Sequence, residues 1–339
     1  MKLFEEYRIK NLLLKNRVVM PPMCMYLTDG SGLLTLDHIV HYTTRAVGGV
    51  GLIIVEATAV SPEGRIEPTD LGLWNQDQQE HFTVLVDQCH QYGAKIAVQL
   101  AHAGRKSFDS DNMIAPSPLA YSGDYGTPKE LTKQEILQKV DDFKAAALRA
   151  VQAGFDLIEV HAAHGYLLHE FLSPITNQRT DEFGGPLENR VRFLELVLEG
   201  IRESVPADFP VGIRVSASDY ETGGLTVMEM AEIINQVKGH VDIVHVSSGG
   251  LTETQPESYP GYQAEFSRVI KEQCGVPTIA VGLIDCPDLA EEIIGNGHAD
   301  LVALGRALLR NPYWVLNAAH AKQVDTFIPE FYQRGFKGF

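Results

Sequence analysis

The sequence predicts a single (β/α)8 TIM barrel of the α/β class, and three observations lead to that fold. First, eight short apolar runs rich in β-branched residues recur along the 339 residues. Second, the run Leu52–Val55 is apolar throughout, as a parallel strand covered on both faces must be. Third, the spacing between runs leaves room for a crossover helix each time. The runs are Val18–Met20, Leu52–Val55, Ile96–Leu100, Asp156–Val160, Val211–Val215, Val241–Val246, Thr278–Val281 and Leu301–Leu304.

Helical segments are expected between these runs. Thr132–Glu135 has the pattern of a capping box and opens a helix that ends at Gly154, where glycine permits the left-handed stop. Thr226–Glu229 repeats the same box before another apolar periodic segment. Pro287 fits the first turn of a further helix, because its missing N–H costs nothing there, and Asp285 is a candidate cap. Two more amphipathic helices are predicted over Phe82–Tyr92 and Val191–Val205.

One domain is expected to span residues 1–339, with residues 325–339 as a C-terminal tail. A barrel of about 250 residues with loop insertions accounts for this length without a second core. The insertions are turn-rich and follow strand ends, so we expect them over the C-terminal face of the barrel. They are Ala115–Pro128, Ser173–Pro186 and Gly249–Gly261. A doubly wound sheet would instead require a G-x-G-x-x-G turn after an early strand, whereas the first run continues into Pro21–Cys24.

Composition and charge argue against several classes of partner. The formal net charge of −16 disfavours nucleic acid or an anionic membrane surface. No stretch approaches the ~18 apolar residues that a membrane-spanning helix needs, and Met1–Asn11 lacks the apolar region of a signal peptide. The cysteines show neither C-x2-C spacing nor a short-domain disulfide pattern, which predicts a reducing, cytoplasmic setting.

The densest chemical signal follows the fourth run. It contains His161, His164 and Tyr166 at the predicted end of a strand. Three such groups can bind a carbonyl or nitro oxygen and deliver a proton. Two alternatives stay open: a strand-capping histidine beside a buried one, or a zinc site with a third ligand such as His102 or Glu159. We predict no metal site, because the histidine pair beside a tyrosine favours the donor role.

Gln99 and Arg214 are polar residues in otherwise apolar runs. The Gln99 amide donates and accepts at once, which suits the edge of a pyrimidine-like ring, although it could equally bridge neighbouring strand ends. A buried Arg214 guanidinium needs a negative partner. That partner is either a charge on a bound ring, as on a reduced flavin, or a carboxylate such as Glu56 or Asp219.

Glycines mark the ends of the seventh and eighth runs, where many α/β barrels bind phosphate. Gly282 and Gly305 permit close approach of the backbone, and Arg306 adds charge and a fork of donors. The helix predicted over Ala307–Arg310 would point its positive end at that phosphate. Cys24 follows the first run and so faces the same pocket, although most cysteines are small buried hydrophobes. A nucleophilic cysteine there would need a lowered pKa.

Taken together, these segments resemble the Old Yellow Enzyme family of flavin-dependent ene-reductases, and within it the bacterial thermophilic-like branch. The match runs from Leu3 to about Phe336, nearly the whole chain. The segments that carry it are Leu14–Met20 continuing into Pro22–Tyr26, Gln99–Arg105, His161–Tyr166, His169–Pro174, Asn177–Asp181, Arg214–Ser216 and Gly305–Arg306. In combination they are highly specific for the family, although no single segment is.

The resemblance implies a noncovalently bound FMN and an NADPH dehydrogenase or ene-reductase activity. NADPH would reduce the flavin and leave, and an activated alkene (an enone, a maleimide or a nitro compound) would then enter the same site, giving ping-pong kinetics. The implied FMN-binding residues are Pro21, Pro22, Met23, Cys24, Ala57, Gln99 and Arg214 around the ring, and Gly282, Gly305 and Arg306 at the phosphate.

The same resemblance assigns catalytic and substrate-binding roles. His161 and His164 would hydrogen-bond the carbonyl oxygen and polarise the double bond. Tyr166 would protonate the α-carbon, with solvent as a competing proton source. Cys24, which stands where other branches carry Thr, would tune the flavin potential and, with Tyr26, touch the substrate.

Near the C-terminus, Tyr332–Phe336 resembles the arginine finger of this branch, with Arg334 reaching into a neighbouring subunit's site. This implies a homodimer or a homotetramer. The chain continues with Lys337–Phe339, which departs from the branch pattern. A polar tail that is merely disordered is the alternative.

Two other functions compete with this interpretation. A flavin-free TIM-barrel lyase or isomerase could bind a phosphorylated substrate through Gly305 and Arg306, but such enzymes often use a Schiff-base lysine or a metal cluster. The predicted strands carry only Lys95, at the wrong end. A binding or scaffold protein gives no reason for two histidines and an arginine to coexist at strand ends.

Overall fold

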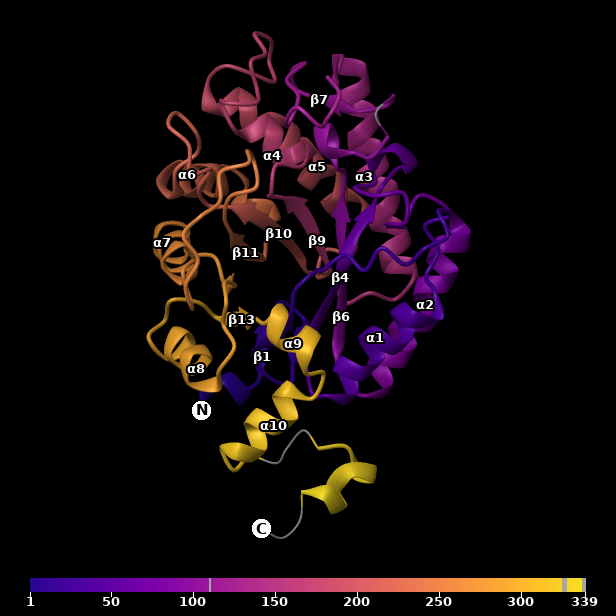
Figure 1. Cartoon of the computed structure of the whole chain (residues 1–339), viewed down its shortest axis with the longest axis vertical. Coiled ribbons are helices and arrows are strands. Elements are labelled where there is room, and N and C mark those ends of the chain that lie inside the picture. Colours follow the sequence, from indigo (N-terminus) through magenta and orange to yellow (C-terminus); the bar gives the residue numbers. More distant parts are fainter. Residues whose placement is uncertain (110, 325–327, 337–339) are drawn as a thin grey trace.

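The computed structural model describes residues 1–109, 111–324 and 328–336, and its centre is a closed parallel barrel (Figure 1). The barrel closes because the first strand pairs with both the last strand and the second. This confirms the predicted (β/α)8 fold. The barrel strands are β3 (Val18–Met20), β4 (Leu52–Ala59), β6 (Lys95–Ala101), β9 (Leu157–Ala162), β10 (Val211–Ser216), β11 (Ile243–Ser247), β12 (Thr278–Ala280) and β13 (Leu301–Ala303). A short β5 (Leu71–Gly72) adds to the end of β4.

Helices surround the barrel on its outer side (Figure 1). Those that alternate with the strands are α1 (Leu36–Val47), α2 (Gln76–Gln91), α3 (Lys133–Gln152), α5 (Leu187–Ser204), α6 (Val227–Val237), α7 (Ala264–Cys274) and α8 (Pro287–Gly295). Both predicted capping boxes are present, with Thr132 and Thr226 at the N-caps of α3 and α6. The prediction that Asp285 caps α8 is wrong, because Cys286 holds the N-cap position without a side-chain hydrogen bond. The Asp285 carbonyl instead accepts the Trp314 indole N–H.

A hairpin that the sequence patterns did not reveal closes the N-terminal end of the barrel. It consists of β1 (Tyr7–Ile9) and β2 (Leu12–Leu14), paired antiparallel. Ile9, Leu12 and Leu14 are buried against interior residues of the barrel strands. This apolar plug seals one end of the barrel, so a ligand site has to open at the other end.

The three insertions pack against one another at the C-terminal ends of the strands. The first forms a small parallel pair, β7 (Ile114–Ala115) with β8 (Lys129–Glu130), and the second follows a short helix, α4 (Leu167–Leu172). The Arg179 guanidinium donates to the Pro116 and Leu131 carbonyls and pairs with Asp181. The Tyr121 hydroxyl donates to the carbonyl of Thr252 in the third insertion. These contacts make a wall above the barrel, as expected.

The chain leaves the barrel through α9 (Arg306–Arg310) and α10 (Trp314–Ala321) and reaches η5 (Glu330–Gly335). Figure 1 shows this last segment beyond α10, outside the ring of helices. Phe331 packs on the ring of Tyr92, and Tyr332 packs on Tyr313. Residues 325–327 and 337–339 of the predicted tail lie outside the described residues. Within the described residues, no helix has the length and apolar character to cross a membrane.

Candidate active site

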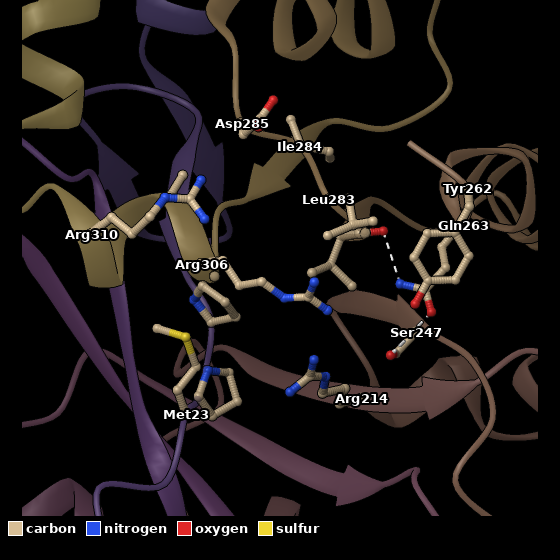
Figure 2. A pocket seen from close by; sticks show the side chains of 16 residues that line it. Met23, Arg214, Ser247, Tyr262, Gln263, Leu283, Ile284, Asp285, Arg306 and Arg310 are labelled. Atoms are coloured by element: carbon tan, nitrogen blue, oxygen red, sulfur yellow. Dashed lines mark hydrogen bonds between the residues drawn. The ribbon is translucent and has the colours of Figure 1, made fainter. Parts of the chain in front are cut away.

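A cavity of about 400 Å³ opens at the C-terminal ends of the strands (Figure 2). It brings together seven of the predicted cofactor-binding residues from four separate parts of the chain: Pro21, Pro22, Met23, Arg214, Gly282, Gly305 and Arg306. Its remaining lining residues are Ser247, Tyr262, Gln263, Val281, Leu283, Ile284, Asp285, Ala307 and Arg310. Cys24, Ala57 and Gln99 are not among the lining residues. The convergence follows from the barrel, because the ends of its parallel strands meet on one face.

The end of the cavity beside β12 and β13 is shaped for an anion. Gly282 has φ +129°, which side chains rarely adopt, and a Cβ there would lie 3.1 Å from Tyr262 and Gln263. Gly305 precedes α9, which begins at Arg306, one residue earlier than predicted. Figure 2 shows the guanidinium groups of Arg306 and Arg214 pointing into the same cavity from α9 and β10. Backbone without side chains at the two glycines, beside two arginine cations, can accommodate a phosphate and a negatively charged ring.

Arg214 makes no ion pair with a carboxylate among the described residues, so the pair considered with Glu56 or Asp219 is not formed. The Glu56 carboxylate accepts from the Tyr42 hydroxyl and the Met25 N–H, and Asp219 lies 3.0 Å from His169. The Arg214 Nε is buried without a hydrogen-bond partner among the described residues. Burial lowers the pKa of Arg214, and Glu159 partly opposes that shift. A buried donor without a partner is costly unless a ligand supplies the acceptor.

Gln99 bridges two strands through its amide. Its Nε2 donates to Glu159 Oε1 at 2.8 Å, and Glu159 Oε2 lies 2.8 Å from His245 Nδ1. The strand-bridging alternative is therefore present. Because a carboxylate only accepts, the amide nitrogen must face Glu159, which leaves the amide oxygen turned away from it. Ala57 lies beside Gln99 on β4, where the register shifts after Val55.

His161, His164 and Tyr166 form one cluster. The ring centroid of His161 lies 5.2 Å from that of His164 and 5.0 Å from that of Tyr166, both edge-on. Burial, assisted by Arg214, holds the pKa of each histidine well below its usual value. Burial raises the pKa of Tyr166 well above its usual value. At neutral pH the cluster therefore consists of two neutral imidazoles and a protonated phenol.

One tautomer in this cluster follows from the backbone. His161 Nδ1 accepts the Ala163 N–H at 3.3 Å, so the imidazole proton is on Nε2. The zinc alternative gains no support, since the described residues contain no group of three or more His, Cys, Asp or Glu side chains arranged to hold a metal ion. Glu159 is engaged with Gln99 and His245, and His102 lies 4.0 Å from Glu63.

Lys106 is a site residue that the sequence analysis missed. Its Nζ donates to the carbonyls of His164 and Gly250, at 3.1 Å each. The same ammonium lies 5.1 Å from the centroid of the Tyr166 ring. Burial lowers the pKa of Lys106 to about 8. A signal existed, because this lysine directly follows the Gln99–Arg105 motif, although it lies outside the predicted strands.

Cys24 and Tyr26 lie on the loop that follows β3. Burial, with Asp70 and Glu56 nearby, raises the pKa of Cys24, which therefore stays a thiol. This is the opposite of the lowered pKa that a cysteine nucleophile needs. Tyr26 has φ +56° and is exposed. Glu56 holds the loop between them by accepting the Met25 N–H at 2.7 Å.

Arg334 lies outside the cavity of its own chain. It belongs to η5, which has no buried residue and packs through its aromatic side chains on Tyr92 and Tyr313. The single chain therefore does not bring this predicted substrate-binding residue to the other site residues.

The barrel, its arginine-lined cavity and the histidine pair define a flavin-dependent oxidoreductase. Residues 2–325 match the model of the NADH:flavin oxidoreductase / NADH oxidase family, and the chain belongs to that family. It is 55% identical over 338 residues to an NADPH dehydrogenase of Clostridium acetobutylicum, covering 99% of this chain and 100% of that one. It is 49% identical to an NADPH dehydrogenase of Geobacillus thermodenitrificans, covering 99% and 98% of the two chains.

Solved structures of two reductases also resemble this chain. Morphinone reductase superposes with a TM-score of 0.81 at 30% identity, over 94% of this chain and 90% of that one. A complex of 2-naphthoyl-CoA reductase superposes with a TM-score of 0.90 at 26% identity, over 96% of this chain and 52% of that one. The predicted membership of the Old Yellow Enzyme family is confirmed, as are the enzyme class and FMN as cofactor. The partnerless Arg214 Nε and the bare backbone at Gly282 fit FMN.

Proposed function

We propose that this enzyme uses NADPH to reduce the carbon–carbon double bond of activated alkenes, namely α,β-unsaturated carbonyl compounds and nitroalkenes, by a ping-pong mechanism. The observation that carries the proposal is the cluster of two neutral imidazoles and a protonated tyrosine at the end of β9. FMN supplies hydride transfer when bound. The described residues have to bind the alkene, polarise it and provide a proton.

The two histidines are proposed to bind the activating oxygen. Hydride addition at the β-carbon places negative charge on that oxygen, and N–H groups aimed at it stabilise the charge. His161 offers its Nε2–H, because its Nδ1 is already occupied by a backbone N–H. Burial lowers the pKa of His164, and the cations of Arg214 and Lys106 add to that shift, which supports a positive field at the same place. Neutral histidines are hydrogen-bond donors that do not compete for the proton that the product needs.

Tyr166 is proposed to donate the proton to the α-carbon. Its phenol is half-buried and keeps its proton at neutral pH, because desolvation raises its pKa. The Lys106 ammonium near the ring favours the phenolate that forms when the proton leaves. Cys24 and Tyr26 are proposed to complete the substrate side of the site as a neutral thiol and an exposed phenol.

The cofactor-binding roles are part of the same proposal. The residues proposed to hold the ring are Pro21, Pro22, Met23, Cys24, Ala57, Gln99 and Arg214, and those proposed to hold the phosphate are Gly282, Gly305 and Arg306. We propose that residues 1–339 form a single FMN-binding domain. The cytoplasmic setting stays a prediction.

The substrate site is proposed to be completed by Arg334 of an adjacent subunit, in a homodimer or homotetramer. The support is that η5 presents Arg334 outside its own chain's cavity while Phe331 and Tyr332 anchor the segment. Sedimentation of the holoenzyme tests the assembly. Mixing an Arg334→Ala variant with a His164→Ala variant tests the shared site, since hybrid dimers should regain one intact site.

The flavin-free lyase or isomerase is not favoured. Lys95, the only lysine on the barrel strands, is the first residue of β6 and pairs with Asp156 at 2.9 Å. It lies at the strand end opposite the cavity and cannot form a Schiff base with a ligand there.

An anaerobic spectroscopic titration tests the proposed function. The flavin band of the purified holoenzyme should bleach with NADPH and return when 2-cyclohexen-1-one is added. Tyr166→Phe should slow only the return of the band. A band that bleaches but does not return with cyclohexenone, a maleimide or a nitroalkene would contradict the proposal.

A further inference from the structure

The ring of His164 is held by a side chain from another strand. His164 Nε2 lies 2.8 Å from the hydroxyl oxygen of Ser247, the last residue of β11. Its backbone N–H donates to Ser216 Oγ at 2.9 Å, and its φ is +60°. The ring is therefore fixed at one nitrogen and at the backbone. Nδ1 makes no hydrogen bond among the described residues, so it is the nitrogen left for a ligand.

A neutral imidazole carries one proton, and its position decides what the free nitrogen can do. If Ser247 donates to Nε2, the ring proton is on Nδ1 and the free nitrogen is a donor. If Nε2 donates to Ser247, the free nitrogen is a bare acceptor, which would repel the oxygen of an enone. A doubly protonated ring would donate from both nitrogens. Burial excludes it at neutral pH by holding the pKa of His164 well below its usual value, so only one of the two tautomers above is present on each ring.

The neighbours of Ser247 determine the direction of its hydroxyl proton. Gln263 Nε2 donates to the Val281 carbonyl at 3.0 Å, which turns Gln263 Oε1 toward the serines. That oxygen already accepts the hydroxyl of Ser248, whose own oxygen accepts from the Tyr220 hydroxyl at 3.0 Å. Ser247 lies 3.4 Å from the same Gln263 oxygen, compared with 2.8 Å from His164 Nε2. The Gln263 oxygen already accepts the Ser248 hydroxyl and lies at the long end of hydrogen-bonding distance from Ser247. We therefore expect the proton of Ser247 on its shorter contact, to His164 Nε2.

We propose that Ser247 is a positioning residue that sets the tautomer of His164, by donating its hydroxyl proton to Nε2 and so placing the ring proton on Nδ1. The two imidazoles of the site then donate through different nitrogens, His161 through Nε2 and His164 through Nδ1. The catalytic consequence rests on the proposed alkene reduction, whereas the proton arrangement itself does not. Ser247 also lines the cofactor cavity (Figure 2). The same side chain therefore contacts both His164 and that cavity.

The tautomer can be measured directly in the FMN-loaded enzyme. The protein has 12 histidines, and labelling them with ¹⁵N gives one long-range ¹H–¹⁵N pattern for each ring. His164→Asn identifies the signals of His164. We expect the wild-type enzyme to show a protonated Nδ1 and Ser247→Ala to show a mixture or the Nε2–H form. A wild-type ring protonated on Nε2 would overturn the proposal.

Kinetics with matched variants provide the second readout. Ser247→Ala should slow the reoxidation of the reduced enzyme by 2-cyclohexen-1-one about tenfold, less than the ~10²–10³-fold expected for removing a donor outright. Ser247→Thr keeps the hydroxyl and should restore the rate. Ser267→Ala makes the same chemical change on α7, at a hydroxyl without a hydrogen-bond partner among the described residues, so it should leave the rate within about twofold of wild type.

The outcomes separate this proposal from the proposed function. Equal losses in Ser247→Ala and Ser247→Thr, or in Ser247→Ala and Ser267→Ala, would show a packing effect and overturn the tautomer role. An unchanged rate in Ser247→Ala would overturn it as well. If no alkene reoxidises the wild-type enzyme but the Nδ1–H form is seen and is lost in Ser247→Ala, the proposed function fails while the role of Ser247 stands.

Discussion

The two ends of the active-site region differ in how their polar groups are satisfied. At the phosphate end, Arg306 is exposed and Gly282 offers backbone without a side chain. Nearby, the buried Arg214 Nε has no hydrogen-bond partner within the part of the chain that the structure describes. At the histidine end, His161 and His164 each have one nitrogen engaged within the protein. The first region therefore depends on a ligand for its partners, whereas the second is organised before any ligand arrives. The comparison indicates that cofactor binding and substrate activation respond to different kinds of mutation.

The largest expected effect comes from removing a preorganised donor. His161→Ala and His164→Ala should each slow reoxidation by 2-cyclohexen-1-one by ~10²–10³-fold, because each removes an N–H aimed at the developing negative charge. FMN should stay bound, since the cavity lining includes neither histidine. Stopped-flow measurement of the separate half-reactions checks this. Wild-type reoxidation rates in both variants would refute the role of the histidines.

At the cofactor end, Arg214→Met should weaken FMN binding about 30-fold, as expected for loss of a charged hydrogen-bonding group worth ~2 kcal/mol. The apoprotein should be as stable as wild type or more stable, because the Arg214 Nε is buried without a hydrogen-bond partner among the described residues. Fluorescence titration with FMN and urea unfolding of the apoprotein measure the two quantities. A strongly destabilised apoprotein with unchanged FMN affinity would show that Arg214 is satisfied by the protein, and so contradict the conclusion that this end of the site depends on a ligand.

Gly282→Ala should weaken FMN binding about tenfold, with a loss of stability of ~1–3 kcal/mol from backbone strain. The cause is the φ of +129°, together with a Cβ only 3.1 Å from Tyr262 and Gln263. Gly295→Ala is a suitable control, since a Cβ there meets nothing within 4 Å. Equal FMN affinities and equal melting temperatures in the two variants would show that the cavity tolerates a side chain at position 282.

The smallest effect concerns pH. The folded-state pKa of Lys106 is lowered to about 8 from 10.5, so the folded protein loses this charge near pH 8 while the unfolded chain keeps it. Between these values the unfolded state binds more protons, and stability should rise with pH relative to Lys106→Met. Alkene reduction should fall about threefold above pH 8, because the ammonium beside Tyr166 is lost. A pH–rate profile of Lys106→Met that keeps this decline would assign it to another group.

Much of the fold was readable from local patterns. The capping boxes at Thr132 and Thr226 involve residues within four positions of each other, so the sequence contains the whole interaction. The barrel runs are mostly apolar because both faces of the strands are covered, and that pattern also needs no partner to be recognised. The cap assigned to Asp285 failed because Cys286 and Pro287 begin the helix instead. The β1–β2 hairpin was missed because its strands are three residues long.

The sequence by itself determined the barrel, the residues grouped at its strand ends and, through its motifs, the flavoenzyme family. Only the tertiary structure decided which polar groups meet. The Arg214 Nε has no hydrogen-bond partner among the described residues, Lys106 donates to the His164 carbonyl, and Ser247 lies 83 residues from the imidazole that it contacts. The physical reason is that strand order and register decide which side chains of different strands come into contact. The sequence of one strand does not show which residue of another strand lies beside it. The spacing of apolar residues and the hydrogen bonds of a capping box, by contrast, involve residues that are near neighbours in the chain.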